Sequence, residues 1–365
     1  MSEEPLPEAD KLDAAAHPRH TSELFGQNEA EATFLEAYNS ERLHHGWLLT
    51  GPRGVGKATL AWRIARFVLR GDEGGLFGPP ADLAIDPETP AFRRTAALSE
   101  PGLMLCRRAY DEKAKRLKIQ LTVEEVRKLK HFFEVSATDG GWRVAIVDAA
   151  DEMNTAAANA LLKILEEPPA KALLLLVCHR PARLLPTIRS RCRTLKLRPL
   201  GNDDLVAALA SLGHDASLGP VETMLAAGSV GEALRVLEGD GASLYLDILA
   251  LLGSARQLDT ARVLALADKA AGRGSEAAYD LILRLTGLAL ARMARAGAGG
   301  EALLPQEQEV AEMLCPGLQP AQAWAEALQD IEARAAHARA VNIDPAQVIL
   351  DSWIAISRAA RSIAA

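Results

Sequence analysis

The decapeptide GPRGVGKATL, residues 51–60, has the residue types and spacing of a loop that binds nucleotide phosphates. Its glycines let backbone N–H groups turn towards phosphate oxygens, and they are Gly51, Gly54 and Gly56. Lys57 would add a positive charge for the β- and γ-phosphates. In a hydrolysing loop the next residue gives a hydroxyl to Mg²⁺, but here it is Ala58. Thr59 comes one residue late, so on a helix it points about 100° away.

A second motif, AIVDAADEMN, places Asp148 at the end of an apolar run, where a Mg²⁺-orienting carboxylate belongs. Many ATPases of this layout continue with a glutamate that polarises the attacking water, and here the next residue is Ala149. Glu152 follows shortly afterwards, and we do not assign it as the base. The alternative for Asp148 is a carboxylate that only caps the next turn. The motif therefore adds Asp148 to the candidate site without supplying a general base.

The elements that must position these residues follow a strand–loop–helix order. GWLLT is typical of a short buried strand, and TLAWRIARFVLR after the loop is typical of an amphipathic helix. Further apolar runs predict strands at 103–106, 143–148 and 172–178, with helices between them, and LPTIRSRC and TLKLRPL complete the unit. Apolar strands that alternate with helices indicate a parallel sheet covered on both faces. The Gly- and Pro-rich residues 71–100 are expected to be irregular, with one short helix.

The sequence changes character after residue 199, so the predicted fold class is α/β plus all-α. Residues 242–365 are rich in Ala, Leu and Arg, in amphipathic segments typical of a helical bundle. A chain of 365 residues is long enough for several domains. We expect a loosely held arm over 1–22, a P-loop domain over 23–199, a helical lid over 200–241 and the bundle over 242–365.

The formal net charge of −7 leaves only local surfaces for contact with nucleic acid. Two basic clusters could provide such a surface: Lys113, Lys115, Arg116 and Lys118, and then Arg127, Lys128 and Lys130. The alternative is a solvated basic surface balanced by neighbouring acids. No apolar segment has the length of a secretory core or a membrane span, so we expect a cytoplasmic protein. Four widely spaced cysteines predict isolated thiols rather than disulfides or a zinc site.

The motifs GPRGVGKATL, IVDAADEMN, NALLKILEEPP and IRSRC occur in this order before the helical regions. In this combination the chain resembles the AAA+ sliding-clamp loaders of bacterial DNA polymerase III, most densely from Phe25 to Leu200. The resemblance implies a RecA-like AAA+ module, a helical lid and a helical collar that joins subunits into a hetero-pentameric ring. The implied partners are clamp-loader subunits of the delta and gamma/tau types, the sliding clamp and primed DNA, and no membrane.

The resemblance also gives a role to Arg191, the arginine of SRC, which by itself is typical of a surface residue. In this family the arginine reaches into the ATP site of the neighbouring subunit as an arginine finger. Such a finger stabilises transition-state charge and can be worth ~10³–10⁵ in rate. The resemblance therefore implies that Arg191 is a catalytic residue that acts in trans.

This sequence departs from the family at the positions that hydrolysis needs: Ala58 replaces the Mg²⁺ hydroxyl, Ala149 the catalytic glutamate, His179 a polar sensor and Gly231 a sensor arginine. Arg235, one helical turn further on, is a weak substitute for that arginine. The four-cysteine zinc module of many relatives is replaced by the Gly/Pro-rich residues 71–103. These changes predict a subunit that does not hydrolyse ATP, holds the nucleotide weakly at most and binds no zinc.

Two other functions stay open at this point. An active AAA+ ATPase, either a gamma/tau-like motor subunit or a helicase-like protein, would need Thr59 to reach the metal and Glu152 to act as the base. A small-molecule P-loop kinase would need a metabolite pocket, which nothing in the helical C-terminal third suggests. A measurement of ATP turnover separates the first alternative from a non-hydrolysing clamp-loader subunit.

Overall fold

The residues described by the computed structural model are 7–11, 15–40, 42–71, 79–113, 115–134, 141–214, 217–272, 274–300 and 304–364. The chain divides into two compact units, which we describe separately. The first comprises residues 1–217 and 226–234, and the second comprises residues 218–225 and 235–365. The predicted lid, 200–241, is divided between them, and its boundaries stay a prediction.

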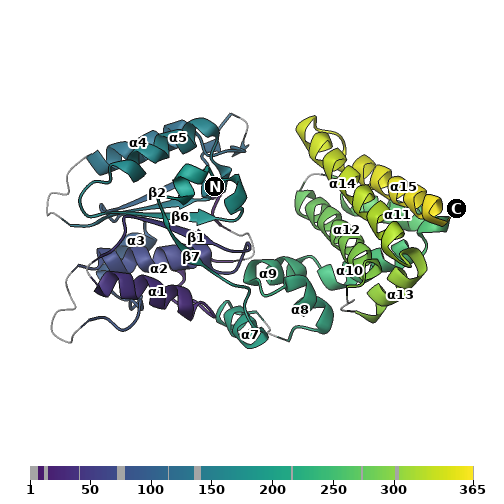
Figure 1. Ribbon diagram of the computed structural model, residues 1–365, viewed down its shortest axis with the longest axis horizontal. Coiled ribbons are helices and arrows are strands. Elements are labelled where there is room, and N and C mark those ends of the chain that lie inside the picture. The colour runs from purple at the N-terminus through teal and green to yellow at the C-terminus, as the bar shows by residue number, and fades with distance from the viewer. Residues whose placement is uncertain are drawn as a thin grey trace, which may run out of the picture. The chain divides into compact units, whose positions relative to one another are not determined.

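The first unit is built on a five-stranded sheet (Figure 1). Its strands in chain order are β1 (Gly46–Thr50), β2 (Leu103–Arg107), β5 (Arg143–Asp148), β6 (Ala172–Cys178) and β7 (Arg193–Lys196). In space the order is β2-β5-β6-β1-β7, and every neighbouring pair is parallel. The strands predicted from apolar runs are all present, and the parallel arrangement confirms the α/β part of the predicted fold class.

Helices cover both faces of this sheet, as Figure 1 shows. One face carries α4 (Val123–Glu134) and α5 (Thr155–Glu166), and the other carries α1 (Asn28–Asn39), α2 (Lys57–Leu69) and α3 (Pro90–Ala96). The start of α5 is fixed by Asn154, whose side chain accepts a hydrogen bond from the N–H of Ala157 at 2.8 Å. The short helix expected in the Gly/Pro-rich insertion is α3, and residues 72–78 lie outside the described residues.

Several short elements connect these layers. They are 3₁₀ turns at Pro18–His20, Ala150–Glu152 and Pro181–Arg183, strands β3 (Tyr110–Asp111) and β4 (Arg116–Leu117), and helices α6 (Pro186–Arg189), α7 (Asn202–Ser211) and α9 (Val230–Glu238). Strands β3 and β4 pair as an antiparallel hairpin. The hairpin was not predicted, because strands of two residues leave no periodic pattern in a sequence.

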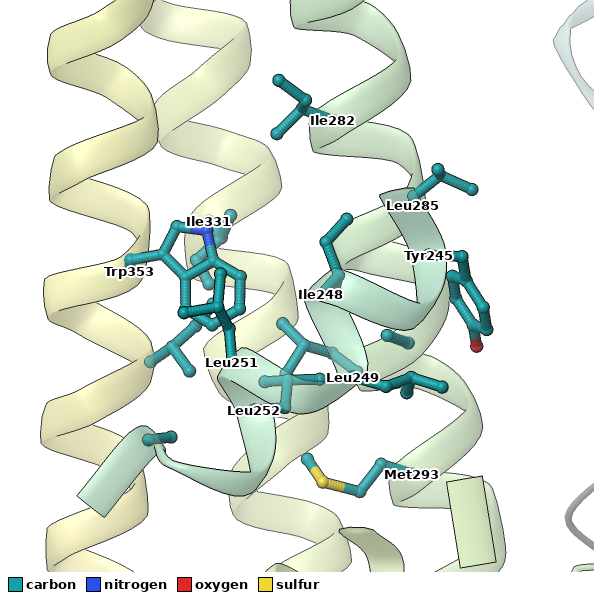
Figure 2. Packing of buried hydrophobic residues seen from close by; sticks show 14 of the residues in the cluster. Tyr245, Ile248, Leu249, Leu251, Leu252, Ile282, Leu285, Met293, Ile331 and Trp353 are labelled. Carbon is teal, nitrogen blue, oxygen red and sulfur yellow. The ribbon is translucent and has the colours of Figure 1, made fainter. Parts of the chain in front are cut away.

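The second unit is helical throughout its described residues. Its elements are α8 (Pro220–Ala226), α10 (Gly241–Gly253), a 3₁₀ turn at Ala255–Gln257, α11 (Thr260–Lys269), α12 (Glu276–Gly297), α13 (Pro305–Leu314), α14 (Leu318–Ala340) and α15 (Pro345–Ala364). Figure 2 shows buried side chains from α10, α12, α14 and α15, among them Tyr245, Ile282, Ile331 and Trp353. This core confirms the all-α part of the predicted fold class.

Two further expectations concern cysteines and membranes. All four cysteines are free thiols, three of them buried and Cys192 partly exposed, as their spacing predicted. None of the described helices combines the length and the apolar character that crossing a bilayer requires.

Candidate nucleotide-binding site

The glycine loop lies at the carboxyl end of β1, which is flanked by β6 and β7. Ligands of open parallel sheets bind at the carboxyl ends of the strands. The backbone angle φ is +144° at Gly51, +72° at Gly54 and +100° at Gly56, a region that favours glycine. The three predicted glycines therefore form one turn that leads directly into α2.

The first residues of α9 and Ser229, which directly precedes this helix, pack against the loop. The Ser229 hydroxyl donates to the Arg53 carbonyl at 2.8 Å, and the Gly231 N–H donates to the Gly54 carbonyl at 3.3 Å. A Cβ added to Gly54 would lie 2.4 Å from the Ser229 Oγ, so only glycine fits there. Gly231, at the family's sensor position, thus contacts the loop through its backbone. Ser229 was not identified from the sequence, where nothing connects it to a loop so distant along the chain.

Lys57 begins α2, and its side chain is turned back onto the loop. Its ammonium group donates to the carbonyl of Gly51 at 2.8 Å and to the carbonyl of Pro52. Burial lowers the pKa of Lys57 to about 8, and the carboxyl groups of Asp148 and Asp151 act in the opposite direction. To reach a phosphate group, the ammonium would have to release these two carbonyls.

Asp148 ends β5 beside the loop and has only 8% of its surface exposed. The pKa of Asp148 is raised to about 8, mainly by burial and then by the nearby carboxylate of Asp10, while Lys57 opposes the increase. The carboxyl group is therefore mostly protonated at neutral pH and would have to lose a proton before binding Mg²⁺. Asp10 comes from the predicted N-terminal arm, where His17 (2.9 Å) and Arg107 hold its carboxylate. No motif in the sequence marked Asp10 as a neighbour of the site.

The two acids in the turn after β5 are both engaged by neighbouring groups. Glu152 pairs with Arg53 at 3.0 Å through one oxygen and with Arg108 at 2.7 Å through the other. Asp151 accepts a hydrogen bond from the backbone N–H of His179 at 2.8 Å. A general base needs a free lone pair directed at the attacking water. In this structure Glu152 instead holds two guanidinium groups.

The remaining positions at which this sequence departs from the family lie at the same carboxyl ends of the strands. His179 follows β6, and burial lowers its pKa to about 3, with the charges of Lys57 and Arg53 adding to the effect. The imidazole is therefore neutral at physiological pH. Ala149 is buried directly after Asp148, and Thr59 lies within the first turn of α2. The structure thus gathers the predicted loop residues and Asp148 into one site, while their roles toward a nucleotide stay predictions.

Arg191 lies near the amino-terminal ends of the strands, whereas this site lies at their carboxyl ends. It precedes β7, whose first residue Arg193 pairs with Trp47 near the start of β1, whereas the glycine loop follows the end of β1. The length of β1, roughly 15 Å for a strand of this size, separates the two regions. Arg191 is therefore out of reach of the loop in its own chain.

The Arg191 side chain is held by two groups of the same unit. One terminal nitrogen donates to the Thr187 carbonyl at 3.1 Å, and the other pairs with Glu166 at 3.0 Å. The Arg191 and Glu166 side chains are 38% and 48% exposed, respectively. The motif NALLKILEEPP contains Glu166, but no separate role for this residue was predicted.

Two of the three cations in the second predicted basic cluster are paired with acids, and the third, Arg127, is exposed without a described ion pair. In α4, Lys128 lies 2.9 Å from Glu125, and Lys130 lies 3.4 Å from Glu134. Such exposed pairs along a helix stabilise it only slightly, but they lower the charge available for an external anion.

The first basic cluster surrounds the β3–β4 hairpin and differs in this respect. Three of its cations are exposed and make no ion pair with a residue in the described part of the chain: Lys113, Lys115 and Arg116. We call these three residues the hairpin patch. Lys118 is half-buried, and its charge acts on Glu124.

A parallel sheet with helices on both faces and a glycine loop between β1 and α2 defines a RecA-like P-loop fold of the AAA+ class. A family model described as DNA polymerase III, delta subunit, matches residues 26–201, so this segment of the chain is similar to that family.

Three known proteins show how far the similarity extends. The chain is 39% identical over 150 residues to DNA polymerase III subunit delta' of Pseudomonas aeruginosa, covering 40% of this chain and 41% of that protein. It is 32% identical over 209 residues to subunit delta' of Escherichia coli, covering 56% and 58%. It is 29% identical over 252 residues to subunit gamma/tau of Mycobacterium bovis, covering 65% and 40%. The resemblance to clamp-loader subunits, and among them to delta', is confirmed, and the match spans less than two thirds of each relative.

Proposed function

We propose that this chain is a non-hydrolysing subunit of a bacterial clamp loader that helps to load the sliding clamp onto primed DNA. It assembles through its C-terminal helical bundle with subunits of the delta and gamma/tau types. It donates Arg191 to the ATP site of a neighbouring subunit. Its own loop, residues 51–57, holds ATP weakly and without turnover.

The state of the nucleotide site is the observation that carries this proposal. Ala58 offers no hydroxyl to a metal, burial raises the pKa of Asp148 to about 8, and Glu152 is paired with two arginines. The backbone turn for phosphates is nevertheless present. Loss of metal coordination should lower turnover far more than contact with phosphates. The same features argue against an active ATPase, which would need Glu152 as its base.

We expect the isolated chain to hydrolyse ATP no faster than its Lys57→Ala variant, because neither retains a metal-assisted reaction. Phosphate release in the presence of Mg²⁺ measures the rate. ATP affinity, measured by equilibrium dialysis, should depend little on Mg²⁺, since the site offers no side chain that would coordinate the metal carried by the ATP phosphates. Turnover above ~1 s⁻¹ that disappears in Lys57→Ala would replace this proposal with the active ATPase.

We further propose that the hairpin patch contacts the phosphate backbone of primed DNA. Cations that neutralise phosphates release counterions, so they provide affinity without reading sequence. The patch offers three exposed charges that no described acid neutralises, in a chain whose net charge is −7. The paired lysines of α4 offer less, because a phosphate group would have to compete with Glu125 and Glu134 for them.

Reversing Lys115 and Arg116 to glutamate should weaken DNA binding by the assembled loader and reduce the salt dependence of binding by roughly two phosphate contacts. The matched control is Lys128→Glu with Lys130→Glu, which makes the same change in net charge on paired side chains. Fluorescence anisotropy of a primed DNA, titrated at several salt concentrations, gives both slopes. If the two double variants have equal slopes of log affinity against log salt concentration, the hairpin patch is an ordinary solvated surface and does not contact DNA.

A further inference from the structure

Glu166 and Arg191 form an exposed ion pair that orders the arginine side chain. The guanidinium group is held at both terminal nitrogens, by the Thr187 carbonyl at 3.1 Å and by the Glu166 carboxylate at 3.0 Å. Terminal N–H groups that do not face these partners stay free, because each terminal nitrogen carries two. With more than a third of its surface exposed, the side chain is held in one conformation and still presents donors to solvent.

Glu166 stands at a position where the helix itself disfavours an acid. It is the last residue of α5, and Glu167 follows as the C-cap. The C-terminal end of a helix carries partial negative charge and favours cations. Arg191 supplies a cation that offsets the repulsion between the Glu166 carboxylate and the negative end of the helix. Exposed residues that break a local rule without a structural gain tend to mark functional positions.

We propose that Glu166 is a positioning residue for Arg191, which holds the guanidinium group in the conformation that meets the ATP of a neighbouring subunit. This inference rests on the proposed arginine-finger function. An arginine that is already ordered loses less conformational freedom when it engages phosphate oxygens. The pair is also exposed enough to be weak, so a polyphosphate of higher charge can take the place of the carboxylate.

The test compares Glu166→Gln with Glu167→Gln in the assembled loader, since each variant removes one exposed charge from the same helix end. We expect Glu166→Gln to lower the kcat of DNA-stimulated ATP hydrolysis about two- to five-fold, the range for an exposed ion pair. The KM for ATP should stay unchanged, because a finger acts on transition-state charge. Glu167→Gln should leave both constants unchanged. The thermal midpoint of Glu166→Gln should not fall, because removing an acid from a helix C-terminus does not weaken the helix.

A double-variant cycle shows whether Glu166 acts through Arg191. In the Arg191→Ala background, Glu166→Gln should cause no further loss of rate, because the group that it positions is gone. An equal loss in both backgrounds would overturn the proposal, and so would a faster rate in Glu166→Gln, which would mean that the carboxylate competes with ATP. If Arg191→Ala lowers the rate and Glu166→Gln does not, only the positioning role is lost. If Arg191→Ala itself has no effect, the arginine finger fails and the positioning role fails with it.

Discussion

Replacing Arg191 by alanine is expected to lower ATP hydrolysis at the neighbouring site of the assembled loader by about 10³-fold or more. A guanidinium group directed at the transferred phosphoryl stabilises charge that develops only in the transition state. Arg191 lies near the amino-terminal end of β1, and its own glycine loop follows the carboxyl end of that strand, so an ATP that Arg191 contacts would belong to another subunit. Single-turnover hydrolysis with DNA and clamp present should show the affected site as a slow phase beside the phases of the other sites.

Two further variants separate a finger from a general effect of charge. Arg189→Ala removes an exposed arginine at the end of helix α6, two residues before Arg191, and should leave the rate unchanged. Arg191→Lys keeps the charge but loses the planar fork that binds phosphate oxygens through two nitrogens, so its rate should fall between wild type and Arg191→Ala. The Arg191→Ala variant should also assemble normally, because its side chain is partly exposed and makes no buried contact. A variant that assembles and hydrolyses ATP at the wild-type rate would rule out the finger.

The sheet could be predicted closely from the sequence because its strands are short, apolar and bounded by strong signals. Strand β6 is an unbroken apolar run, and β1 runs directly from one glycine into a glycine loop. Strand β7 was not predicted as a strand, although it overlaps the segment TLKLRPL that completes the unit. It lies at the edge of the sheet, with one neighbouring strand, so burial constrains its residues less. The hairpin of β3 and β4 escaped prediction because its strands are too short to show a period.

The positions of site residues were predicted where a motif linked them to an adjacent strand or turn. Asp148 ends β5, and the loop glycines follow β1. Because the strands are parallel, their carboxyl ends lie on the same side of the sheet, which brings these residues together. Asp10 and Ser229 reach the same site from distant parts of the chain. Such contacts depend on tertiary packing, which leaves no local pattern in the sequence. Glu166 lay inside a quoted motif, but only the structure pairs it with Arg191.

Replacing Asp148 by asparagine is expected to stabilise the isolated chain, by up to roughly 4 kcal/mol at pH 7. Asparagine keeps the shape of the side chain but removes a buried acid whose pKa is about 8. In the unfolded chain the same group has a pKa of about 3.9. Between these values the folded protein binds a proton that the unfolded chain has released. Wild-type stability therefore contains an unfavourable contribution that grows from about pH 4 to about pH 8.

The pH dependence gives this prediction its sharpest test. The advantage of Asp148→Asn over wild type should be smallest near pH 4, increase by no more than about 1.4 kcal/mol per pH unit and level off above about pH 8. Denaturation midpoints measured at several pH values follow it. The control is Asp151→Asn, which should give no gain because that carboxylate accepts backbone hydrogen bonds from His179 and Arg180. An advantage that shrinks as the pH rises would mean that Asp148 is an ionised partner of Lys57. In that case a metal-binding carboxylate is already present, and the argument for a site that cannot organise Mg²⁺ would lose its electrostatic support.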